Sequence, residues 1–449
     1  MKILLVYPAK HDSNGNTIKY KQAFLPPLSL AILDALTPEN HSVEIINDIV
    51  EEIDFSKKYD LVGITTMTTQ VARAYAIADT FRSKQVKVVL GGMHPTILPE
   101  EALQHADTVV VGEADNIWPK LLEDAENNCM KEIYKDETSP DLQTLVIPKW
   151  ENVNMSIYPK PPWQKYPKMP IFTTRGCPYG CEFCSVTKYF GKKYRMKPVD
   201  HVLKEIDSTE ADDFFFVDDN IACSPKYSRE LFKALSKRDI RWFSQISTRV
   251  LDNPDLLQLA SDSGCNVLLV GVESLNSGSL GGVSKGFNNV DKYEELIKLM
   301  KAAKIGPLLS FVFGFDEDTP DQFRLTLEFL KKNKVDYASF WILTPLPGTT
   351  LYEKMKDGGR ITSSDWSQYD LSHVVFEPKS FTKEELLDTY WKSYQELFSL
   401  KNMPGAIYNS VTTSKTPFQM ALESIFYFSY YRNKVNTCDH PFSGGIDKL

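Results

Sequence analysis

Residues 171–184 read Ile171-Phe172-Thr173-Thr174-Arg175-Gly176-Cys177-Pro178-Tyr179-Gly180-Cys181-Glu182-Phe183-Cys184. The first four residues are apolar or β-branched and predict a strand. Three cysteines follow in C-x3-C-x2-C spacing, and Gly176 and Gly180 allow the chain to turn tightly around them. Thiolates at this spacing can bind three irons of a cubane iron–sulfur cluster. No fourth cysteine is nearby, so one iron would stay open for an outside ligand.

The other four of the seven cysteines are scattered along the chain. Clustering of three cysteines in a chain expected to be cytosolic favours a metal site over a disulfide framework. The alternatives are a zinc knuckle and a redox thiol cluster. Zinc would need a fourth Cys or His in a short second motif, and none follows. We interpret Cys129, Cys223, Cys265 and Cys438 as inert thiols.

From Ile171 onward, strand-like and helix-like patterns alternate in roughly six β/α units. The predicted strands are 171–174, 214–217, 242–246, 267–270, 308–313 and 338–343. The predicted helices are 198–208, 225–237, 254–263, 289–303 and 320–333, several with proline in the first turn. Right-handed crossovers would wind these units into a curved parallel sheet, a partial (β/α)6 barrel with its chemistry on the loops after the strands.

The segment before the cysteines shows the same alternation. Strand-like runs at 2–7, 42–47, 61–66, 86–90 and 108–111 are separated by helical patterns at 28–36, 71–83 and 99–105. This order predicts an α/β domain with a doubly wound parallel sheet, whose ligand lies beyond the carboxyl ends of the strands. No phosphate-type glycine fingerprint is present, and a broad planar ligand suits such an edge better than a dinucleotide.

The pattern divides the chain into four parts. We predict an amino-terminal domain at 1–135, a proline-rich linker at 136–168, the barrel at 169–375 and a helical carboxyl-terminal segment at 376–449. In the last part, 381–400 and 418–431 are helical, and Thr382 is a predicted helix cap.

The composition is that of an ordinary globular protein, with 449 residues, 42% apolar and 24% charged. The net charge is −8 and no basic block stands out, so we expect no nucleic-acid partner. The first apolar run stops at Pro8 and lacks the features of a signal peptide. No run reaches the roughly 20 apolar residues needed to cross a bilayer. We therefore expect a cytoplasmic protein without a transmembrane segment.

The cysteine motif on its strand resembles the radical S-adenosylmethionine superfamily. The resemblance implies that Cys177, Cys181 and Cys184 hold a 4Fe–4S cluster whose open iron binds the amino and carboxylate groups of S-adenosylmethionine. Phe183 takes the place of the aromatic residue that packs near the adenine. It also implies cleavage of the sulfonium to a 5′-deoxyadenosyl radical, with the electron supplied by a donor such as flavodoxin or ferredoxin.

Further family-like positions follow the later strands and are predicted to bind S-adenosylmethionine. Arg249 would pair with the methionine carboxylate, Glu273 would accept hydrogen bonds from the ribose, and Gly314 would let the adenine approach the backbone. The alternative for the polar residues after the second strand is a cap for the helix that begins at Pro225. The predicted set is Phe183, Asp218, Asp219, Asn220, Ser247, Arg249, Glu273, Ser310 and Gly314.

The amino-terminal domain resembles the cobalamin-binding half of cobalamin-dependent radical enzymes. The resemblance implies cobalamin contacts from loops at strand ends, at Pro27, Leu28, Thr65, Thr66, Met67, Thr68, Gly91, Gly92, His94, Gly112 and Glu113. The D-x-H-x-x-G motif of methionine-synthase-type domains is absent, so no histidine is assigned as lower ligand of cobalt. The position of His94 is equally compatible with a role as a loop residue that makes hydrogen bonds. A degenerate domain that binds no cofactor is the alternative.

As a whole, the chain resembles the group that contains the hopanoid methylases and the anaerobic magnesium-protoporphyrin ester cyclase. The resemblance implies methylation of an unactivated carbon in a small-molecule or lipid substrate. The alternatives are a radical cyclase, oxidase or ring-rearranging enzyme, a tRNA methylthiotransferase and a cofactor sensor. The tRNA enzymes carry extra cysteines ahead of the triad and a basic tail, which are lacking here.

The aromatic stretch 418–428 could line a pocket for a lipid or pigment, or simply pack against the rest of the protein. Cys438 and His440 could bind a metal or lie in a loose tail.

Overall fold

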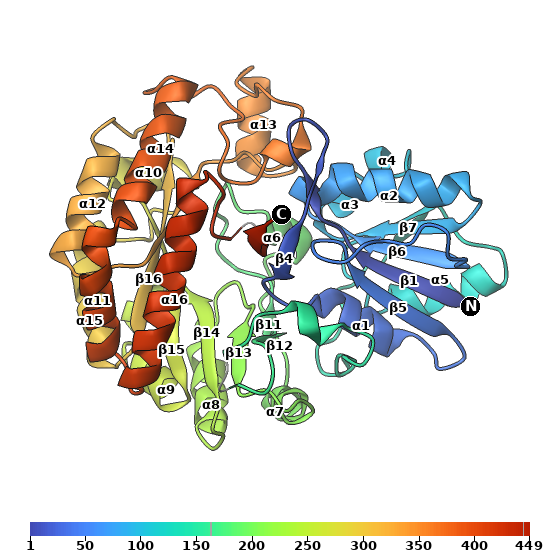
Figure 1. The fold of residues 1–449 in the computed structure, drawn as a ribbon, viewed down its shortest axis with the longest axis horizontal. Helices are drawn as coiled ribbons and strands as arrows, with labels where there is room; N and C mark the ends of the chain where they lie inside the picture. The colour runs from blue at the N-terminus through green and yellow to red at the C-terminus, as the bar shows by residue number, and fades with distance from the viewer. Residues whose placement is uncertain (162–163, 443) are drawn as a thin grey trace.

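Two six-stranded parallel sheets, one in each half of the chain, organise the computed structural model (Figure 1). It describes residues 1–161, 164–442 and 444–449. Residues 162 and 163 of the predicted linker therefore lie outside the described residues. The predicted α/β architecture, a doubly wound domain followed by a partial barrel, is confirmed.

The amino-terminal sheet has the strand order β5-β1-β6-β7-β8-β9. Its strands are β1 (Lys2–Tyr7), β5 (Ser42–Asn47), β6 (Leu61–Thr65), β7 (Lys87–Gly91), β8 (Thr108–Val111) and β9 (Ile133–Lys135). Its helices are α1 (Leu28–Leu36), α2 (Val71–Ser83), α3 (Met93–Ile97), α4 (Pro99–Ala102) and α5 (Ile117–Glu126). Two apolar clusters cover the two faces of this sheet, which is why the central strand β1 is a continuous apolar run.

The second sheet has the order β10-β13-β14-β15-β16-β17 and forms a barrel that stays open between its edge strands β10 and β17. Its strands are β10 (Met169–Ile171), β13 (Asp213–Phe216), β14 (Arg241–Ile246), β15 (Cys265–Glu273), β16 (Gly306–Phe313) and β17 (Ala338–Ile342). Its helices are α7 (Val199–Asp207), α8 (Pro225–Leu235), α9 (Asp255–Asp262), α10 (Ser277–Gly282), α11 (Tyr293–Ala302) and α12 (Gln322–Lys332). The predicted strands and helices match these within a few residues.

The helical carboxyl-terminal part contains α13 (Thr350–Asp357), α14 (Lys383–Leu397), α15 (Met403–Thr412) and α16 (Pro417–Asn436). Thr382 caps α14, because its hydroxyl accepts from the Glu385 N–H while the Glu385 carboxylate accepts from the Thr382 N–H. Four 3-10 turns lie in the connections, η2 (Met155–Ile157), η3 (Thr248–Asp252), η5 (Trp366–Gln368) and η6 (Leu400–Asn402), besides η1 (Thr68–Gln70) before α2 and η4 (Val290–Lys292) before α11.

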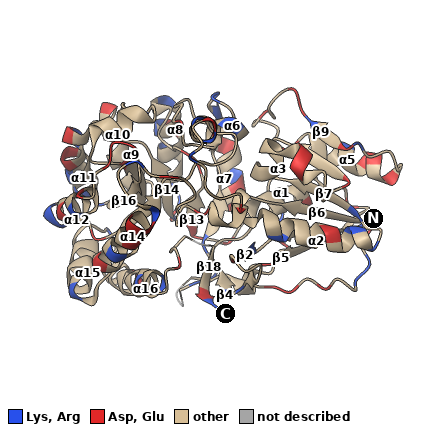
Figure 2. Cartoon of the chain, turned by 90° about the horizontal axis from the view of Figure 1, so that it is seen from above, with Lys and Arg blue, Asp and Glu red and all other residues tan. Residues whose placement is uncertain are grey.

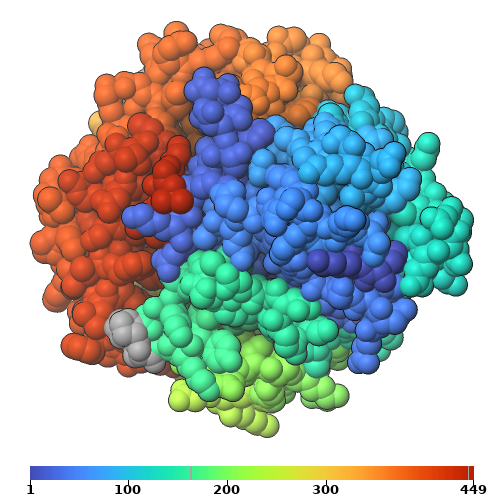
Figure 3. Space-filling view, turned by 45° about the vertical axis from the view of Figure 1, so that its right-hand side comes forward, coloured from blue at the N-terminus to red at the C-terminus, as the bar shows by residue number. Residues whose placement is uncertain are grey.

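An unpredicted excursion of the amino-terminal domain reaches across to the barrel. It consists of β2 (Lys10–His11), β3 (Thr17–Ile18) and β4 (Tyr20–Ala23), and β4 pairs antiparallel with the last strand, β18 (Gly445–Lys448). Figure 3 shows this dark blue segment against the red carboxyl-terminal part. The last strand of the chain is therefore paired with a segment of the amino-terminal domain.

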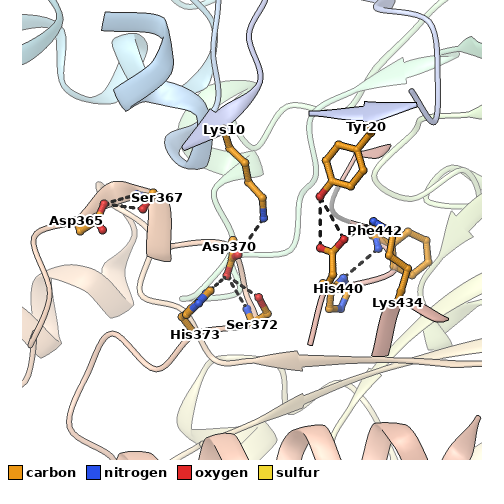
Figure 4. A network of polar contacts seen from close by, with 11 residues as sticks. Lys10, Tyr20, Asp365, Ser367, Asp370, Ser372, His373, Lys434, His440 and Phe442 are labelled. Atoms are coloured by element: carbon orange, nitrogen blue, oxygen red, sulfur yellow. Dashed lines mark hydrogen bonds and ion pairs between the residues drawn. The ribbon is translucent and has the colours of Figure 1, made fainter. Parts of the chain in front are cut away.

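Ion pairs fix the excursion in place (Figure 4). Lys10 pairs with Asp370 at 3.3 Å, and Asp370 also contacts the His373 ring at 2.8 Å. On the other side, the Tyr20 hydroxyl donates to Asp439, which Lys434 also contacts. The domains are thus joined by polar contacts as well as by the linker.

Acidic and basic residues are interspersed over both domains (Figure 2). Within the described ranges, no helix has the length and apolar character needed to cross a membrane.

Candidate active site

The three motif cysteines lie on a loop between β11 (Thr174–Arg175) and α6 (Val186–Tyr189), at the carboxyl-terminal end of the barrel. The loop is closed at its base because β11 pairs antiparallel with β12 (Arg195–Met196). Gly176 has φ +92°, and a Cβ there would collide with the Lys193 carbonyl oxygen. Glycine is therefore required where the loop begins.

Burial raises the pKa of the Cys177 and Cys184 thiols to about 11, and a further cysteine of the loop adds to each shift. Backbone N–H groups lower these two pKa values by a smaller amount, Tyr179 for Cys177 and Val186 for Cys184, because they donate hydrogen bonds to the sulfur. None of the three thiols of the loop donates to a described residue, unlike Cys265, which donates to a carbonyl. The three thiols thus lie close together, donate to no described residue, and need nearby positive charge to ionise. These properties fit an iron–sulfur cluster.

No described group of three His, Cys, Asp or Glu side chains is placed to hold a single metal ion.

Glu273 and Lys285 form a buried ion pair beside the cysteine loop. Glu273 ends β15 with φ +64°, a left-handed conformation that is costly for a side chain of this kind. The Lys285 ammonium lies 5.7 Å from the centroid of the Phe183 ring, and its charge lowers the pKa of Cys181 against the stronger effect of burial. The sequence predicted Glu273 and Phe183 but missed Lys285, which follows α10 in a loop without periodicity.

Of the polar residues after β13, Asp218 points back into the barrel. Its carboxylate accepts from the Thr173 N–H at 3.1 Å and from the Thr174 hydroxyl at 2.5 Å. Burial raises the pKa of Asp218. These hydrogen bonds hold the strand that leads into the cysteine loop, and they use the oxygens of the Asp218 carboxylate.

Asp219 faces the space between the domains. No described residue donates a hydrogen bond to it, and burial, followed by the charge of Asp218, raises its pKa to about 7. Asn220 is buried and accepts from the Ser247 N–H at 3.2 Å. It therefore joins two strand-end loops.

The remaining predicted residues have structural contacts. Arg249 is half exposed and pairs with Asp252 at 2.9 Å, and Ser247 caps η3 by accepting from the Arg249 N–H. Ser310, on the inner face of the sheet, accepts from the Trp341 indole at 3.0 Å. Gly314 has φ +101°, and a Cβ there would approach Leu386 to 3.0 Å, so packing against α14 already explains this glycine.

A cavity with about 1050 Å³ of empty space separates the two domains. The amino-terminal domain contributes six of the predicted cobalamin residues to its wall: Leu28, Thr65, Gly91, Gly92, Gly112 and Glu113. The barrel contributes Phe172, Thr174, Arg175, Val217 and Asp219. The cavity thus reaches from the carboxyl ends of β6, β7 and β8 to the strand that carries the cysteine loop.

Two glycines keep this cavity open. At Gly92, with φ +98°, a Cβ would come within 2.7 Å of the Thr66 carbonyl oxygen. At Gly112, with φ +89°, a Cβ would meet no atom within 4 Å and would extend into free space. A floor of small residues and backbone fits a broad planar group such as a corrin.

Five of the predicted cobalamin residues do not line the cavity: Pro27, Thr66, Met67, Thr68 and His94. Met67 is half exposed. His94 is fully buried, and its ring nitrogens contact the Thr68 hydroxyl at 3.3 Å and the Glu101 carboxylate at 3.1 Å. Both nitrogens are therefore engaged within the domain.

A buried ion network joins the domains at the rim of the cavity. Arg175 contacts Glu113 at 2.5 Å and Asp115 at 2.7 Å, and Arg195 contacts Glu113 at 2.5 Å. Arg175 stands two residues before Cys177, so the network couples a loop of the amino-terminal sheet to the base of the cysteine loop. Only Glu113 of these residues was singled out in the sequence.

Comparison with known proteins agrees with this geometry. Residues 171–330 match the model of the radical SAM superfamily, and residues 22–122 match that of the B12 binding domain. The chain is 35% identical to a bacteriochlorophyllide d C-12(1)-methyltransferase of Chlorobaculum tepidum, over 91% of each chain. It is 34% identical to the C-8(2)-methyltransferase of the same organism, over 86% of this chain and 90% of the relative.

The chain belongs to the cobalamin-dependent radical S-adenosylmethionine methyltransferases. The solved structure of TsrM from Kitasatospora setae, a methyltransferase of this kind, shares the fold with a TM-score of 0.65, 15% identity, and coverage of 95% of this chain and 99% of that chain. The family uses a 4Fe–4S cluster, S-adenosylmethionine and cobalamin, and the two bacteriochlorophyllide d relatives methylate carbon. The resemblance seen in the sequence is confirmed.

Proposed function

We propose that this methyltransferase acts on a carbon of a broad apolar pigment of the bacteriochlorophyllide class. The observation that carries the proposal is the near-complete match to two methyltransferases that act on bacteriochlorophyllide d. The aromatic lining of the barrel interior, with Phe215 and Phe243 stacked at 4.7 Å, is compatible with such a substrate.

Cys177, Cys181 and Cys184 would hold the cluster, since they are the crowded thiols of a closed loop. When bound, the cluster supplies the electron that cleaves S-adenosylmethionine, and cobalamin supplies the methyl group. Flavodoxin or ferredoxin is the kind of donor that would reduce the cluster.

Lys285 and Glu273 would bind the two ends of S-adenosylmethionine. Lys285, within reach of the cysteine loop, suits the methionine carboxylate, and Glu273 suits the ribose hydroxyls. In the structure the two side chains pair with each other, which satisfies both charges in the absence of that ligand. Phe183 beside them would cover the adenine. Asp218, Asn220, Ser247, Arg249, Ser310 and Gly314 would act by shaping the surrounding loops.

The cavity between the domains would hold cobalamin, with its lower face on the Thr65 and Gly91–Gly92 loops. Its upper face would look toward the cysteine loop and Asp219. Asp219, which faces this space without a donor, would meet S-adenosylmethionine or the methyl acceptor there.

The test is anaerobic purification with cobalamin, reconstitution of the cluster, and incubation with S-adenosylmethionine, a reductant and bacteriochlorophyllide d. We expect a product heavier by one methylene unit, together with 5′-deoxyadenosine and S-adenosylhomocysteine. The Cys177→Ala variant should form none of them. Formation of deoxyadenosine with no methylated pigment, across a panel of pigments, would contradict the substrate class while leaving the family assignment intact.

A further inference from the structure

A second cavity lies at the end of the barrel opposite to the cysteine loop, and the proposed chemistry gives it no role. It holds about 920 Å³ of empty space between the inner face of the sheet and α16. The sheet contributes Phe243, Val267 and Leu308 near the starts of their strands, and α16 contributes Met420 and Tyr427.

The inner face of this sheet is only partly filled by side chains at β14 and β15. On the outer face, under the helices, Trp242 and Leu268 are fully buried. On the inner face, Phe243, Gln245 and Leu269 remain partly accessible. A closed parallel barrel ordinarily packs its interior with side chains. The accessible inner face therefore marks space for a ligand.

The strand register connects the two cavities. Phe215 is paired with Phe243, and Phe243 with Val267, so these residues form a row across the inner face near the second cavity. Val217 lies two residues after Phe215, on the same side of the strand, and lines the cavity between the domains. Phe215 and its strand neighbour Phe243 therefore lie between the lining of the second cavity and Val217 at the interdomain cavity.

Charged residues at the second cavity neutralise one another. Lys168 contacts Asp213 at 3.4 Å, Arg241 contacts Asp213 at 3.0 Å, and Arg241 contacts Glu423 at 2.7 Å. Two cations and two carboxylates leave no net charge for a ligand to balance. Because the rest of the wall is largely apolar and aromatic, the cavity favours an uncharged apolar group.

The outer surface next to this cavity is also apolar. Phe418 is 80% exposed, and Leu422, Phe426 and Tyr408 are exposed on the same two helices, α15 and α16, that contribute to the cavity wall. A surface of this kind is compatible with an apolar ligand that enters past these helices.

We propose that the second cavity binds the far edge of the methyl acceptor's apolar ring system, while the reacting carbon lies at the interdomain end. The inference rests on the proposed function and deepens it. A rigid ring system lying along β13 and β14 would reach from Phe243 at one cavity to Val217 at the other. The cavity then selects the acceptor by the length and apolar character of its ring system.

The test fills the cavity from its two walls. Val267→Phe enlarges a side chain of the sheet, and Met420→Trp enlarges one of α16, so that a folding defect in one variant does not remove the other. Leu325→Trp is the matched control, because Leu325 is exposed on α12, away from the cavity and from the apolar surface of α15 and α16. Folding is checked by circular dichroism melting. Binding is measured with bacteriochlorophyllide d by its absorbance shift, and with pyrene, a neutral planar hydrocarbon, by fluorescence.

For the wild type and Leu325→Trp we expect equal affinity for both probes. In Val267→Phe and Met420→Trp, affinity for both should fall about tenfold or more, since the space is occupied. Folded cavity variants that bind the pigment like the wild type would overturn the inference and leave the proposed function standing. If the wild type does not bind the pigment, the proposed substrate class fails. Pyrene binding then decides whether the cavity is an apolar ring site. Loss of pyrene binding only in the two cavity variants supports such a site, and unchanged pyrene binding overturns it.

Discussion

At the scale of single residues, the cysteines of the loop and the scattered cysteines should respond differently to substitution. We expect Cys181→Ala to lose cluster assembly and deoxyadenosine formation, because the cluster would lose one of its three protein ligands. Iron analysis and anaerobic absorbance spectra check the first effect, and chromatography of deoxyadenosine the second. Cys129→Ala, at an exposed thiol, is the control and should retain both properties. Normal iron content in Cys181→Ala would refute the ligand assignment.

The Glu273–Lys285 pair gives a second prediction. Lys285→Met should weaken binding of S-adenosylmethionine by about one to two decades, because a charge-assisted hydrogen bond contributes about 1.5–3 kcal/mol. Glu273→Gln should weaken it less, since an amide still accepts a bond from the ribose. Isothermal titration of the reconstituted protein measures both. A dissociation constant that does not move in Lys285→Met would show that the pair serves only to hold β15 against the cysteine loop.

At the residue level, a sequence motif singles out candidates where its spacing fixes the chemistry, and it gives no signal where the contact partner is distant. The triad and Glu273 stand out by spacing and by position after a strand. The engagement of Asp218 with Thr173 and Thr174 could not be foreseen, because it depends on two strands meeting in the sheet. Lys285, Arg175 and Arg195 carry no local signal that separates them from the other cations of the chain.

At the scale of elements, the ion network around Glu113 should stabilise the contact between the domains. Glu113→Gln leaves Arg195 without a buried countercharge and leaves Arg175 with Asp115 alone, and breaking such a pair costs about 3–5 kcal/mol. Thermal unfolding should shift to lower temperature, and the linker should become easier to cleave by protease. Lys392→Ala removes an exposed pair with Asp388 on α14 and should change stability by less than about 0.5 kcal/mol. Equal stability of the two variants would contradict the role of the network.

Strands and helices were predicted well where burial of one face gives the sequence a regular apolar pattern. They were predicted poorly where a contact with a distant part of the chain determines the structure. The barrel strands alternate or run apolar because helices cover one face, and their bounds came out within a few residues. By contrast, β4 has no apolar run and exists because β18, more than 400 positions later in the chain, pairs with it. The short helix α15 was missed because Gly405 in its first turn lowers the helix propensity of a short segment, although Pro404 is compatible with a helix start.

At the scale of the whole molecule, the cavity is shared by two domains, so its ligand should act on both. Hydroxocobalamin at about a hundredfold excess over its dissociation constant should stabilise the fold by about 2.7 kcal/mol. Hydrogen exchange should slow both in the loops at Thr65 and Gly112 and in the barrel segment at Phe172 and Thr174, since all of these line the cavity. Protection confined to the amino-terminal domain would mean that cobalamin binds away from the barrel.

The same architecture predicts how cobalt is held from below. His94 is fully buried, and both ring nitrogens are engaged, one with Thr68 and the other with Glu101, which Trp366 of η5 also contacts. To reach cobalt, the ring would have to give up its contacts with both Thr68 and the Glu101 carboxylate, at a cost of about 1–3 kcal/mol. We therefore expect the bound Co(II) form to show no nitrogen superhyperfine splitting in its electron paramagnetic resonance spectrum. His94→Gln, which keeps a polar side chain at the site, should give the same spectrum and lose only stability. Splitting that is present in the wild type and vanishes in His94→Gln would establish histidine coordination and would require that α3 rearranges when cobalamin binds.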